Sequence, residues 1–185
     1  MPHTVALTRH LRTDSDAVKE IQATLSWNYG EPIALHYALK GDLSRLRVPK
    51  LRPARKSDRL WEHTCFEAFF ALKGESAYYE INLAPSGEWA VYSFHRYREP
   101  AAAPKQKLAP EITARSAGES FQLDVSMWMD CLRPIQPGAR LSVALSAVIE
   151  DNRGRLSYWA LKHPSGKPDF HHRDGFELEI ERPAK

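Results

Sequence analysis

Apolar and polar side chains alternate with a period of two along most of the chain, and turn residues recur at short intervals. Residues 20–27 show the pattern, because Ile21, Ala23 and Leu25 alternate with polar neighbours, as they do in a half-buried strand. Residues 33–39 repeat it. Further strands are predicted at residues 64–71, 78–83, 89–94, 121–126, 141–150, 156–161 and 176–180.

Helical turns are predicted at only two places, residues 14–20 and 127–132, and Pro134 limits the second. No internal repeat is visible, and no shift in composition divides the chain. A series of short strands separated by turns is typical of a sandwich. The sequence therefore predicts an all-β antiparallel β-sandwich that forms a single domain over residues 1–185.

Composition is that of an ordinary soluble domain, with 43% hydrophobic and 26% charged residues in 185 positions, which excludes a disordered chain. The 26 basic residues are nearly matched by 23 acidic ones, so nucleic acid is not favoured as a partner. No apolar run approaches the roughly 20 residues of a membrane span, and the first residues lack the apolar region of a signal peptide. We expect a cytoplasmic protein with no membrane partner.

Cysteine and local charge add little chemistry. Cys65 and Cys131 are expected to be reduced, inert thiols rather than a disulfide or a zinc site.

Basic residues gather between residues 45 and 59. A solvated loop is the first interpretation of this segment, and binding of an anionic ligand, nucleic acid or protein is the alternative. Residues 99–110, which contain several prolines, are predicted to form a surface connector.

Strand parity collects polar side chains on one face of the predicted sandwich. Glu67 points away from the apolar row formed by its neighbours Phe66 and Phe70. If residues 73–76 form a four-residue hairpin loop, Glu67 directly faces Asn82 and lies diagonally from Glu80. The same loop places Phe70 opposite Tyr79 and Phe66 opposite Leu83.

Two further hairpins extend this face. A type I turn at residues 84–87 places Ile81 over Ala90 and turns Trp89 and Val91 toward the face of Glu80. A loop at residues 151–154 places Trp159 opposite Ser146, as the floor of a low, polar groove. A loop or strand of the protein itself packing over this face is the alternative.

The side chains on this face suit a polyol. Sugars rest their C–H faces on aromatic rings, and their hydroxyl groups bond to carboxylates and amides. Glutamate and asparagine also occur in β-sandwiches as buried polar groups that only support the structure. A purely structural role for these side chains is therefore the alternative to ligand binding.

Several segments together resemble the DOMON-like group related to family 9 carbohydrate-binding modules. They are residues 60–70, 78–83, 85–89, 146–151, 156–160 and 168–176, the last containing Asp-Phe-His-His-Arg-Asp-Gly-Phe. The resemblance spans nearly the whole chain and points to the bacterial DOMON-like branch. It implies a jelly-roll-like β-sandwich that binds sugar or haem.

The resemblance also implies site residues. Trp61 stands where the sugar-binding modules have the first of two clamping tryptophans, and Phe170 stands at the second. Glu67 and Asn82 correspond to contacts with sugar hydroxyl groups, and Glu80 occupies the position of a basic contact. Next to Phe170, His171 and His172 add hydrogen-bond donors and a charge that can vary near neutral pH.

Other chemistry has weaker signals. The histidines and aspartates between residues 163 and 174 fit no zinc spacing, and we expect them to bond to neighbouring carboxylates or backbone. Met127 and His95 are the candidates for a haem ligand. No cofactor is predicted, with haem and calcium left open. Glu67 and Glu80 are the pair that an enzyme would use, yet no nucleophile, phosphate or metal motif accompanies them.

The sequence thus predicts a non-catalytic module that binds a small polar ligand, a saccharide or sugar-containing metabolite, in an aromatic and acidic groove. A haem-binding domain and a protein-interaction module using residues 45–59 are the alternatives, and the oligomeric state is left open. The predicted ligand-binding residues are Trp61, Glu67, Glu80, Asn82, Trp159, Phe170, His171 and His172.

Overall fold

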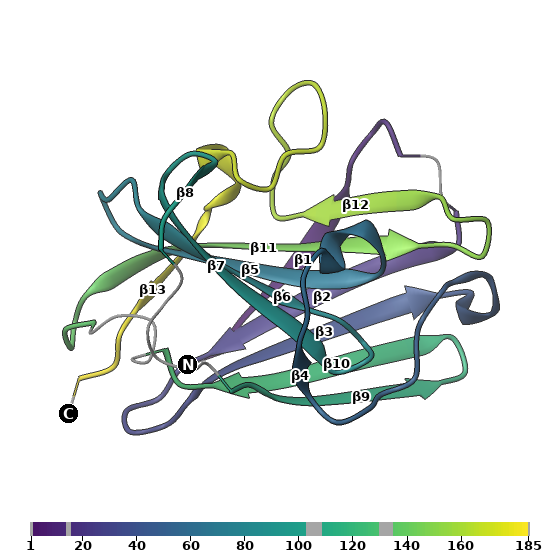
Figure 1. The fold of residues 1–185 in the computed structure, drawn as a ribbon, viewed down its shortest axis with the longest axis horizontal. Coiled ribbons are helices and arrows are strands. Elements are labelled where there is room, and N and C mark those ends of the chain that lie inside the picture. The colour runs from purple at the N-terminus through teal and green to yellow at the C-terminus, as the bar shows by residue number, and fades with distance from the viewer. Residues whose placement is uncertain (1, 14–15, 103–108, 130–134, 185) are drawn as a thin grey trace.

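The computed structural model describes residues 2–13, 16–102, 109–129 and 135–184, and it is built mainly of β-strands (Figure 1). Three-residue 3₁₀ helices lie between some of them: η1 (Leu43–Arg45), η2 (Leu60–Glu62) and η4 (Arg173–Gly175). The strands are β1 (His3–Arg9), β2 (Val18–Ser26), β3 (Ile33–Gly41), β4 (Arg55–Lys56), β5 (Cys65–Leu72), β6 (Tyr78–Leu83), β7 (Glu88–Arg96), β8 (Glu99–Pro100), β9 (Glu111–Ala117), β10 (Ser120–Met127), β11 (Arg140–Glu150), β12 (Leu156–Ala160) and β13 (Leu178–Glu181).

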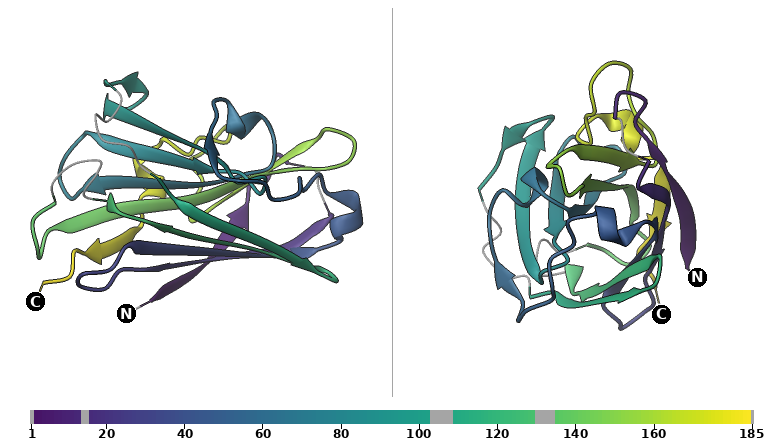
Figure 2. Two further views of the ribbon diagram at one scale, coloured as in Figure 1. Left: turned by 60° about the horizontal axis from the view of Figure 1, so that its bottom comes forward. Right: turned by 90° about the vertical axis from the view of Figure 1, so that its right-hand side faces the viewer.

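The strands form two layers (Figures 1 and 2). The first layer has the order β1-β2-β3-β10-β9, and the second has β4-β7-β6-β5-β11-β12, with β8 beside β7 and β13 beside β11. Strand β1 joins the layers, because it pairs with β2 along most of its length and with β12 at Thr8 and Arg9. Among the strands that the structure describes, all pairings are antiparallel except that of β4 with β7. The predicted all-β antiparallel sandwich is confirmed.

The main core lies between the layers. Phe66 on β5 stacks on Phe121 on β10, with ring centroids 5.7 Å apart. Tyr37 on β3 packs against Phe66 at 5.0 Å, and its hydroxyl donates to the backbone oxygen of Glu67 at 2.8 Å. These fully buried rings fix the second layer against the first, so the side chain of Glu67 points to the outer face of the second layer.

The predicted register of β5 and β6 is confirmed. Phe66 pairs with Leu83, Phe70 with Tyr79, and Glu67 with Asn82. Since side chains alternate along each strand, Glu80 and Asn82 share the outer face with Glu67.

The predicted register of β6 and β7 is wrong by one residue. Leu83 opposes Trp89 and Ile81 opposes Val91, so both β7 side chains face the core rather than Glu80. The loop is shorter than expected, because Ala84 N–H donates to the Glu88 oxygen at 2.8 Å and leaves residues 85–87 as the connection. Gly87 adopts φ +86° there, a conformation that suits glycine.

The predicted register of β11 and β12 is also wrong by one residue. Asp151 N–H donates to the Arg155 oxygen at 2.9 Å, which shortens the loop to residues 152–154. As a result Trp159 opposes Ala147 instead of Ser146. Its indole is buried in the main core and donates to Ser157 Oγ at 3.1 Å. Trp159 therefore does not form the floor of an outer groove, and its neighbour Tyr158 takes the outward position.

Four strands lie outside the predicted set: β1, β9 and the two-residue strands β4 and β8. Leu7 is the one buried side chain of β1, and no residue of β9 is more than partly buried, so β1 and β9 carry only a short alternating apolar signal. The helical turn expected at residues 14–20 is wrong in its described part, since β2 begins at Val18, while residues 14–15 lie outside the described residues. The turn expected at residues 127–132 falls partly outside the described residues, and Met127 itself ends β10.

The basic segment, residues 45–59, is mostly exposed, as expected for a solvated loop. Four of its five arginines are paired with carboxylates: Arg45 with Asp16, Arg47 with Glu150, Arg55 with Glu88, and Arg59 with Glu62. Much of its local positive charge is therefore balanced within the protein. Within the described residues, no helix has the length and apolar character needed to cross a membrane.

Candidate functional site

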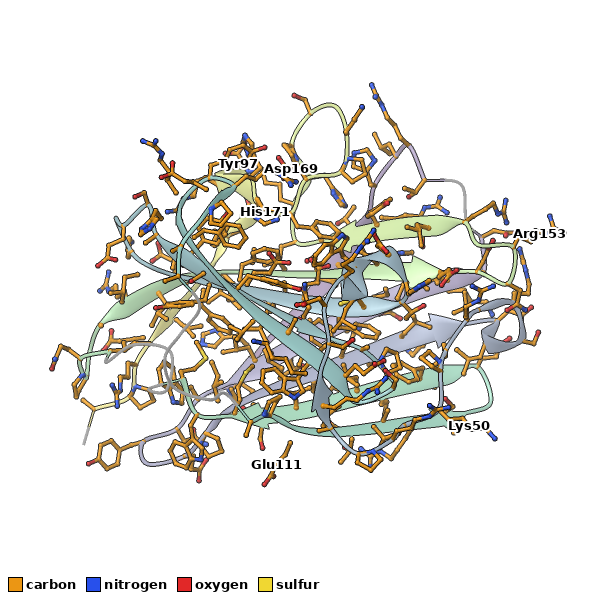
Figure 3. All side chains as sticks on the ribbon, in the orientation of Figure 1. Lys50, Tyr97, Glu111, Arg153, Asp169 and His171 are labelled. Carbon is orange, nitrogen blue, oxygen red and sulfur yellow. The ribbon has the colours of Figure 1, made fainter. Side chains whose placement is uncertain are left out.

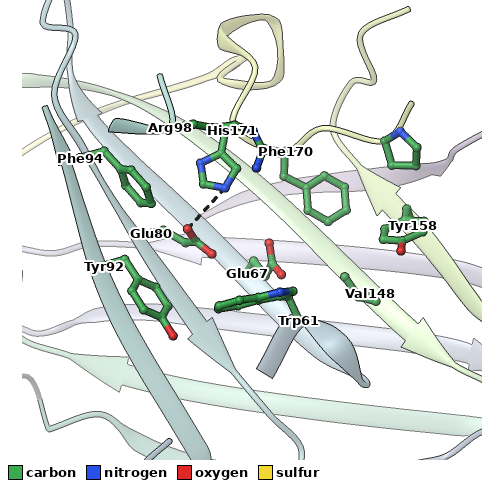
Figure 4. Close-up of a pocket in the computed structure, with 11 residues that line it drawn as sticks. Trp61, Glu67, Glu80, Tyr92, Phe94, Arg98, Val148, Tyr158, Phe170 and His171 are labelled. Carbon is green, nitrogen blue, oxygen red and sulfur yellow. Dashed lines mark ion pairs between the residues drawn. The ribbon is translucent and has the colours of Figure 1, made fainter. Parts of the chain in front are cut away.

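A cavity of about 390 Å³ opens on the outer face of the second layer (Figure 4). Strands β5, β6, β7, β11 and β12 form its floor, and η2, the β7–β8 turn and residues 168–171 form its rim. It is lined by Trp61, Glu67, Glu80, Tyr92, Phe94, Arg98, Val148, Tyr158, Pro168, Phe170 and His171.

Cross-strand pairing explains why two carboxyl groups meet on this floor. Glu67 lies between Asn82 on β6 and Ser146 on β11, while Glu80 lies between Phe69 on β5 and Tyr92 on β7. Outward positions recur at every second residue of a strand, so Glu67 and Glu80 become diagonal neighbours.

Both carboxyl groups are buried, with Glu67 3% and Glu80 5% exposed. Asn82 Nδ2 donates to Glu80 Oε1 at 2.9 Å. Burial raises the pKa of Glu80 to about 7, although the Asn82 amide and the Arg98 charge act in the opposite direction. Burial and then the charge of Glu80 raise the pKa of Glu67 well above its usual value. The pair therefore retains a proton at pH values where surface glutamates are ionised.

His171 stands beside this pair as a neutral group. Its Nδ1 lies 2.8 Å from the Tyr78 hydroxyl, and its Nε2 lies 3.6 Å from Glu80 Oε2. Burial and then the charge of Arg98 lower the pKa of His171 to about 4. Because the Tyr78 oxygen accepts from the backbone N–H of Arg98, its own proton is available to Nδ1. The ring proton then belongs on Nε2, facing Glu80.

The rim is held by Asp169. Arg98 donates to its Oδ1 at 2.8 Å, and the Tyr97 hydroxyl donates to its Oδ2 at 2.6 Å. The backbone N–H of His171 also donates to Oδ1, at 3.1 Å. Figure 3 shows Tyr97, Asp169 and His171 grouped at one edge of the molecule. Arg98 adopts φ +52° in the turn, a left-handed conformation that is uncommon for a side chain of this size.

Aromatic rings stand on two sides of the carboxyl groups. Trp61, on η2, is 41% exposed and packs edge-on against Tyr92, with centroids 5.7 Å apart. Phe170 packs edge-on against Tyr158, with centroids 6.1 Å apart. Figure 4 shows Glu67 between Trp61 on one side and Phe170 on the other, with Glu80 beside it below His171. The cavity thus has apolar walls and an acidic floor.

The predicted site residues separate into three groups. Trp61, Glu67, Glu80, Phe170 and His171 line the cavity. Asn82 is fully buried beneath them and supports Glu80. Trp159 lies in the core, as described above, and His172 points away, with Nδ1 3.8 Å from Asp174 Oδ2.

Sequence reasoning missed several lining residues. Tyr92 and Tyr158 would have followed from the correct hairpin registers, since they oppose Glu80 and Val148 on the outer face. Arg98 could not be placed from strand alternation or hairpin register, because it lies in a turn rather than in a strand.

Cofactor candidates lie apart from the cavity. Met127 is buried in the main core and His95 is exposed on β7, and neither lines the cavity. Within the described residues, no group of three or more histidine, cysteine, aspartate or glutamate side chains is arranged to hold a metal ion. The thiol of Cys65 is buried, and this burial raises its pKa. Cys131 lies outside the described residues.

Comparison with protein-family models finds no match, and comparison with curated protein sequences finds none either. Among solved structures, the fold is similar to that of a "putative carbohydrate-binding protein" from Bacteroides uniformis, with a TM-score of 0.67 and 15% identity. That alignment covers 97% of this chain and 85% of the other.

A family 9 carbohydrate-binding module from Caldicellulosiruptor kristjanssonii is also similar. Its complex with glucose aligns with a TM-score of 0.59 and 8% identity over 95% of this chain and 83% of the module. Its complex with cellotriose gives 0.58 and 8% over 98% and 84%. At these identities the likeness shows a shared β-sandwich fold, which agrees with the fold implied by the family 9 part of the sequence resemblance. The DOMON-like part stays a prediction.

Proposed function

We propose that this protein binds a saccharide, or a small molecule that contains a sugar, in the cavity between Trp61 and Phe170. The observation that carries the proposal is the acidic floor: Glu67 and Glu80 are buried, yet both reach a cavity with aromatic walls. Buried carboxyl groups at a cavity that water and ligands can enter are typical of sites that recognise polar ligands.

The walls and the floor fit different faces of a sugar ring. The C–H faces of the ring can rest on Trp61 and Phe170, while hydroxyl groups at its edge can donate to Glu67 and Glu80. A hydrogen bond to a charged partner contributes about 1.5–3 kcal/mol, and an aromatic contact about 0.5–1.5 kcal/mol. A cavity of about 390 Å³ lies near the lower end of the usual range for small-ligand sites, which suits a small sugar.

The solved neighbours support the same class of ligand. The family 9 module is described in complex with glucose and with cellotriose. Together with the position of Trp61, which the sequence resemblance matches to a clamping tryptophan, this likeness favours sugar over other polyols. Haem binding and protein interaction through residues 45–59 remain the competing proposals.

Isothermal titration calorimetry with glucose, cellobiose and cellotriose tests the proposal. We expect binding that Trp61→Ala weakens by about tenfold or more, because the mutation removes one wall. Trp128→Ala is the matched control, since Trp128 is 55% exposed and does not line the cavity. Absence of heat for every saccharide at millimolar concentration, with folded protein, would overturn the proposal. A Soret band after incubation with haemin would support the haem alternative.

A further inference from the structure

The cavity floor offers many more hydrogen-bond acceptors than donors. Two carboxyl groups that share one proton present about seven acceptor sites and one O–H donor. The donors that face them are the Asn82 amide, the Ser146 hydroxyl and the His171 Nε2–H. A ligand that fits this floor must therefore bring donors.

The floor also lacks an available positive charge. Arg98 is the lining residue that carries one, and its guanidinium is committed to Asp169 at 2.8 Å. His171 is neutral near pH 7 for the reasons given above. The other titratable groups around the pair are Tyr37, Cys65, Tyr78, Tyr92 and Tyr158, all with raised pKa values and all neutral near pH 7. Within the described part of the chain, two acidic groups thus share a buried space with no cation of their own.

We propose that the preferred ligand is an amino sugar, whose primary ammonium group lies against Glu67 and Glu80 while the ring rests between Trp61 and Phe170. The inference rests on the proposed sugar-binding function and names the class of sugar. An ammonium group supplies three donors and a full positive charge in a compact shape. Hydrogen bonds between ionised partners are about twice as strong as those between neutral ones.

The charge explains how two acids can be buried together. An isolated carboxylate in a buried site is costly, and it is retained where a counter-charge or a proton compensates it. In the free protein the pair keeps a proton near neutral pH, and a bound ammonium would replace that proton. Binding should therefore release protons, and the affinity for the amine should rise as the carboxyl groups ionise.

Calorimetry with glucosamine, glucose and N-acetylglucosamine at about pH 7 tests the proposal. These sugars share one ring, and only glucosamine carries the ammonium. We expect glucosamine to bind at least about tenfold more tightly than the other two, as one added charge-assisted contact would give. The set should include a 6-amino sugar, which moves the ammonium to the other end of the ring. If the 6-amino sugar shows the preference instead, that result also supports the proposal.

Variants identify the source of the preference. Glu67→Gln and Glu80→Gln keep the size of each side chain but remove its charge, and each should bring the ratio of glucosamine to glucose affinity toward one. Glu111→Gln, on the exposed strand β9 of the other layer, should keep the ratio of the natural protein. Between about pH 5.5 and about pH 7, the affinity for glucosamine should rise more steeply than that for glucose.

The outcomes separate the two proposals. Equal affinities for the amino and neutral sugars would overturn the amino-sugar proposal and leave sugar binding intact. A preference that survives in both Gln variants would also overturn it, since the selectivity would then arise elsewhere. Absence of binding by every sugar in the set would overturn the proposed function itself.

Discussion

The Arg98 guanidinium donates to Asp169 Oδ1 at 2.8 Å and thereby ties the β7–β8 turn to the segment that carries Phe170 and His171. Arg98 keeps a left-handed backbone conformation in this turn, with φ +52°. The Asp169 carboxylate also accepts from Tyr97 and from the backbone of His171. One carboxylate thus sets the position of one wall of the cavity.

Asp169→Asn should weaken ligand binding while leaving the fold nearly as stable. The change removes the charge that holds Arg98, so residues 168–171 become less fixed over the cavity. Because the Arg98 side chain is 51% exposed, the loss of unfolding free energy should stay within about 1 kcal/mol. Calorimetry and chemical denaturation measure the two effects, and hydrogen exchange at the His171 amide should increase.

Asp174→Asn is the matched control for that change. Asp174 is 57% exposed and faces His172, outside the cavity, at 3.8 Å. It should bind ligand like the natural protein. Equal loss of binding in both variants would contradict a specific role for Asp169.

The neighbours Tyr158 and Trp159 should respond in opposite ways to truncation. Trp159→Ala removes a ring from the main core and should cost about 3–5 kcal/mol of unfolding free energy, with ligand affinity kept in the folded fraction. Tyr158→Ala removes a cavity wall and should weaken binding severalfold at a smaller cost in stability. Denaturation and calorimetry on both variants check this, and the reverse pattern would contradict the observed register of β11 and β12.

These hairpins show where sequence reasoning succeeds and where it stops. Alternation predicts the central strands, and a correct loop length between β5 and β6 correctly places Glu67 opposite Asn82. In the β6–β7 hairpin, and again in the β11–β12 hairpin, the loop is one residue shorter than predicted. This difference exchanges the inward-facing and outward-facing side chains of the second strand relative to the prediction. Trp159 and Tyr158 exchange faces for that reason alone.

Gly87→Ala should destabilise the protein more than Gly74→Ala does. Both glycines have φ +86°, so alanine is equally strained by the backbone at either site. At Gly87 an added Cβ would lie 2.5 Å from the Arg52 backbone oxygen, whereas at Gly74 it meets nothing within 4 Å. We expect a cost above about 1 kcal/mol for Gly87→Ala, compared by urea denaturation. Equal costs would show that the segment at Arg52 moves aside freely.

The cavity could be predicted only in part, because its residues come from different kinds of structure. Strand parity brings Glu67 and Glu80 together, and the family resemblance points to Trp61 and Phe170. Arg98 and its tie to Asp169 depend on the three-dimensional path of a turn and a loop that are distant in sequence. Strand β9 escapes prediction because its apolar side chains, Ile112 and Ala114, are few and only partly buried.

Ionisation of the buried glutamates should make the protein less stable as pH rises. The folded-state pKa of Glu80 is about 7 against a usual value of 4.5, so the folded state binds more protons than the unfolded state between those pH values. The contribution of this group to stability is then fully present below about pH 4.5 and is lost as pH rises through about 7. Its slope is at most about 1.4 kcal/mol per pH unit.

His171 acts in the opposite direction over part of this range. Its folded-state pKa is lowered to about 4 from 6.5, so unfolding takes up a proton between these values and stability rises with pH. The curve of the natural protein therefore mixes both effects, and a comparison of variants separates them.

Glu80→Gln removes the titrating carboxyl group and keeps the size of the side chain. Relative to the natural protein, the variant should gain stability progressively from about pH 5 to about pH 8, because it no longer buries a group that ionises there. Urea denaturation at several pH values measures the difference, and Glu119→Gln, whose side chain is 71% exposed in the turn between β9 and β10, should leave the pH dependence unchanged. A difference between Glu80→Gln and the natural protein that stays constant across this range would mean that Glu80 is ionised at all these pH values. The cavity would then bury a permanent negative charge on Glu80, and any proton released on binding of an amine would have to come from Glu67.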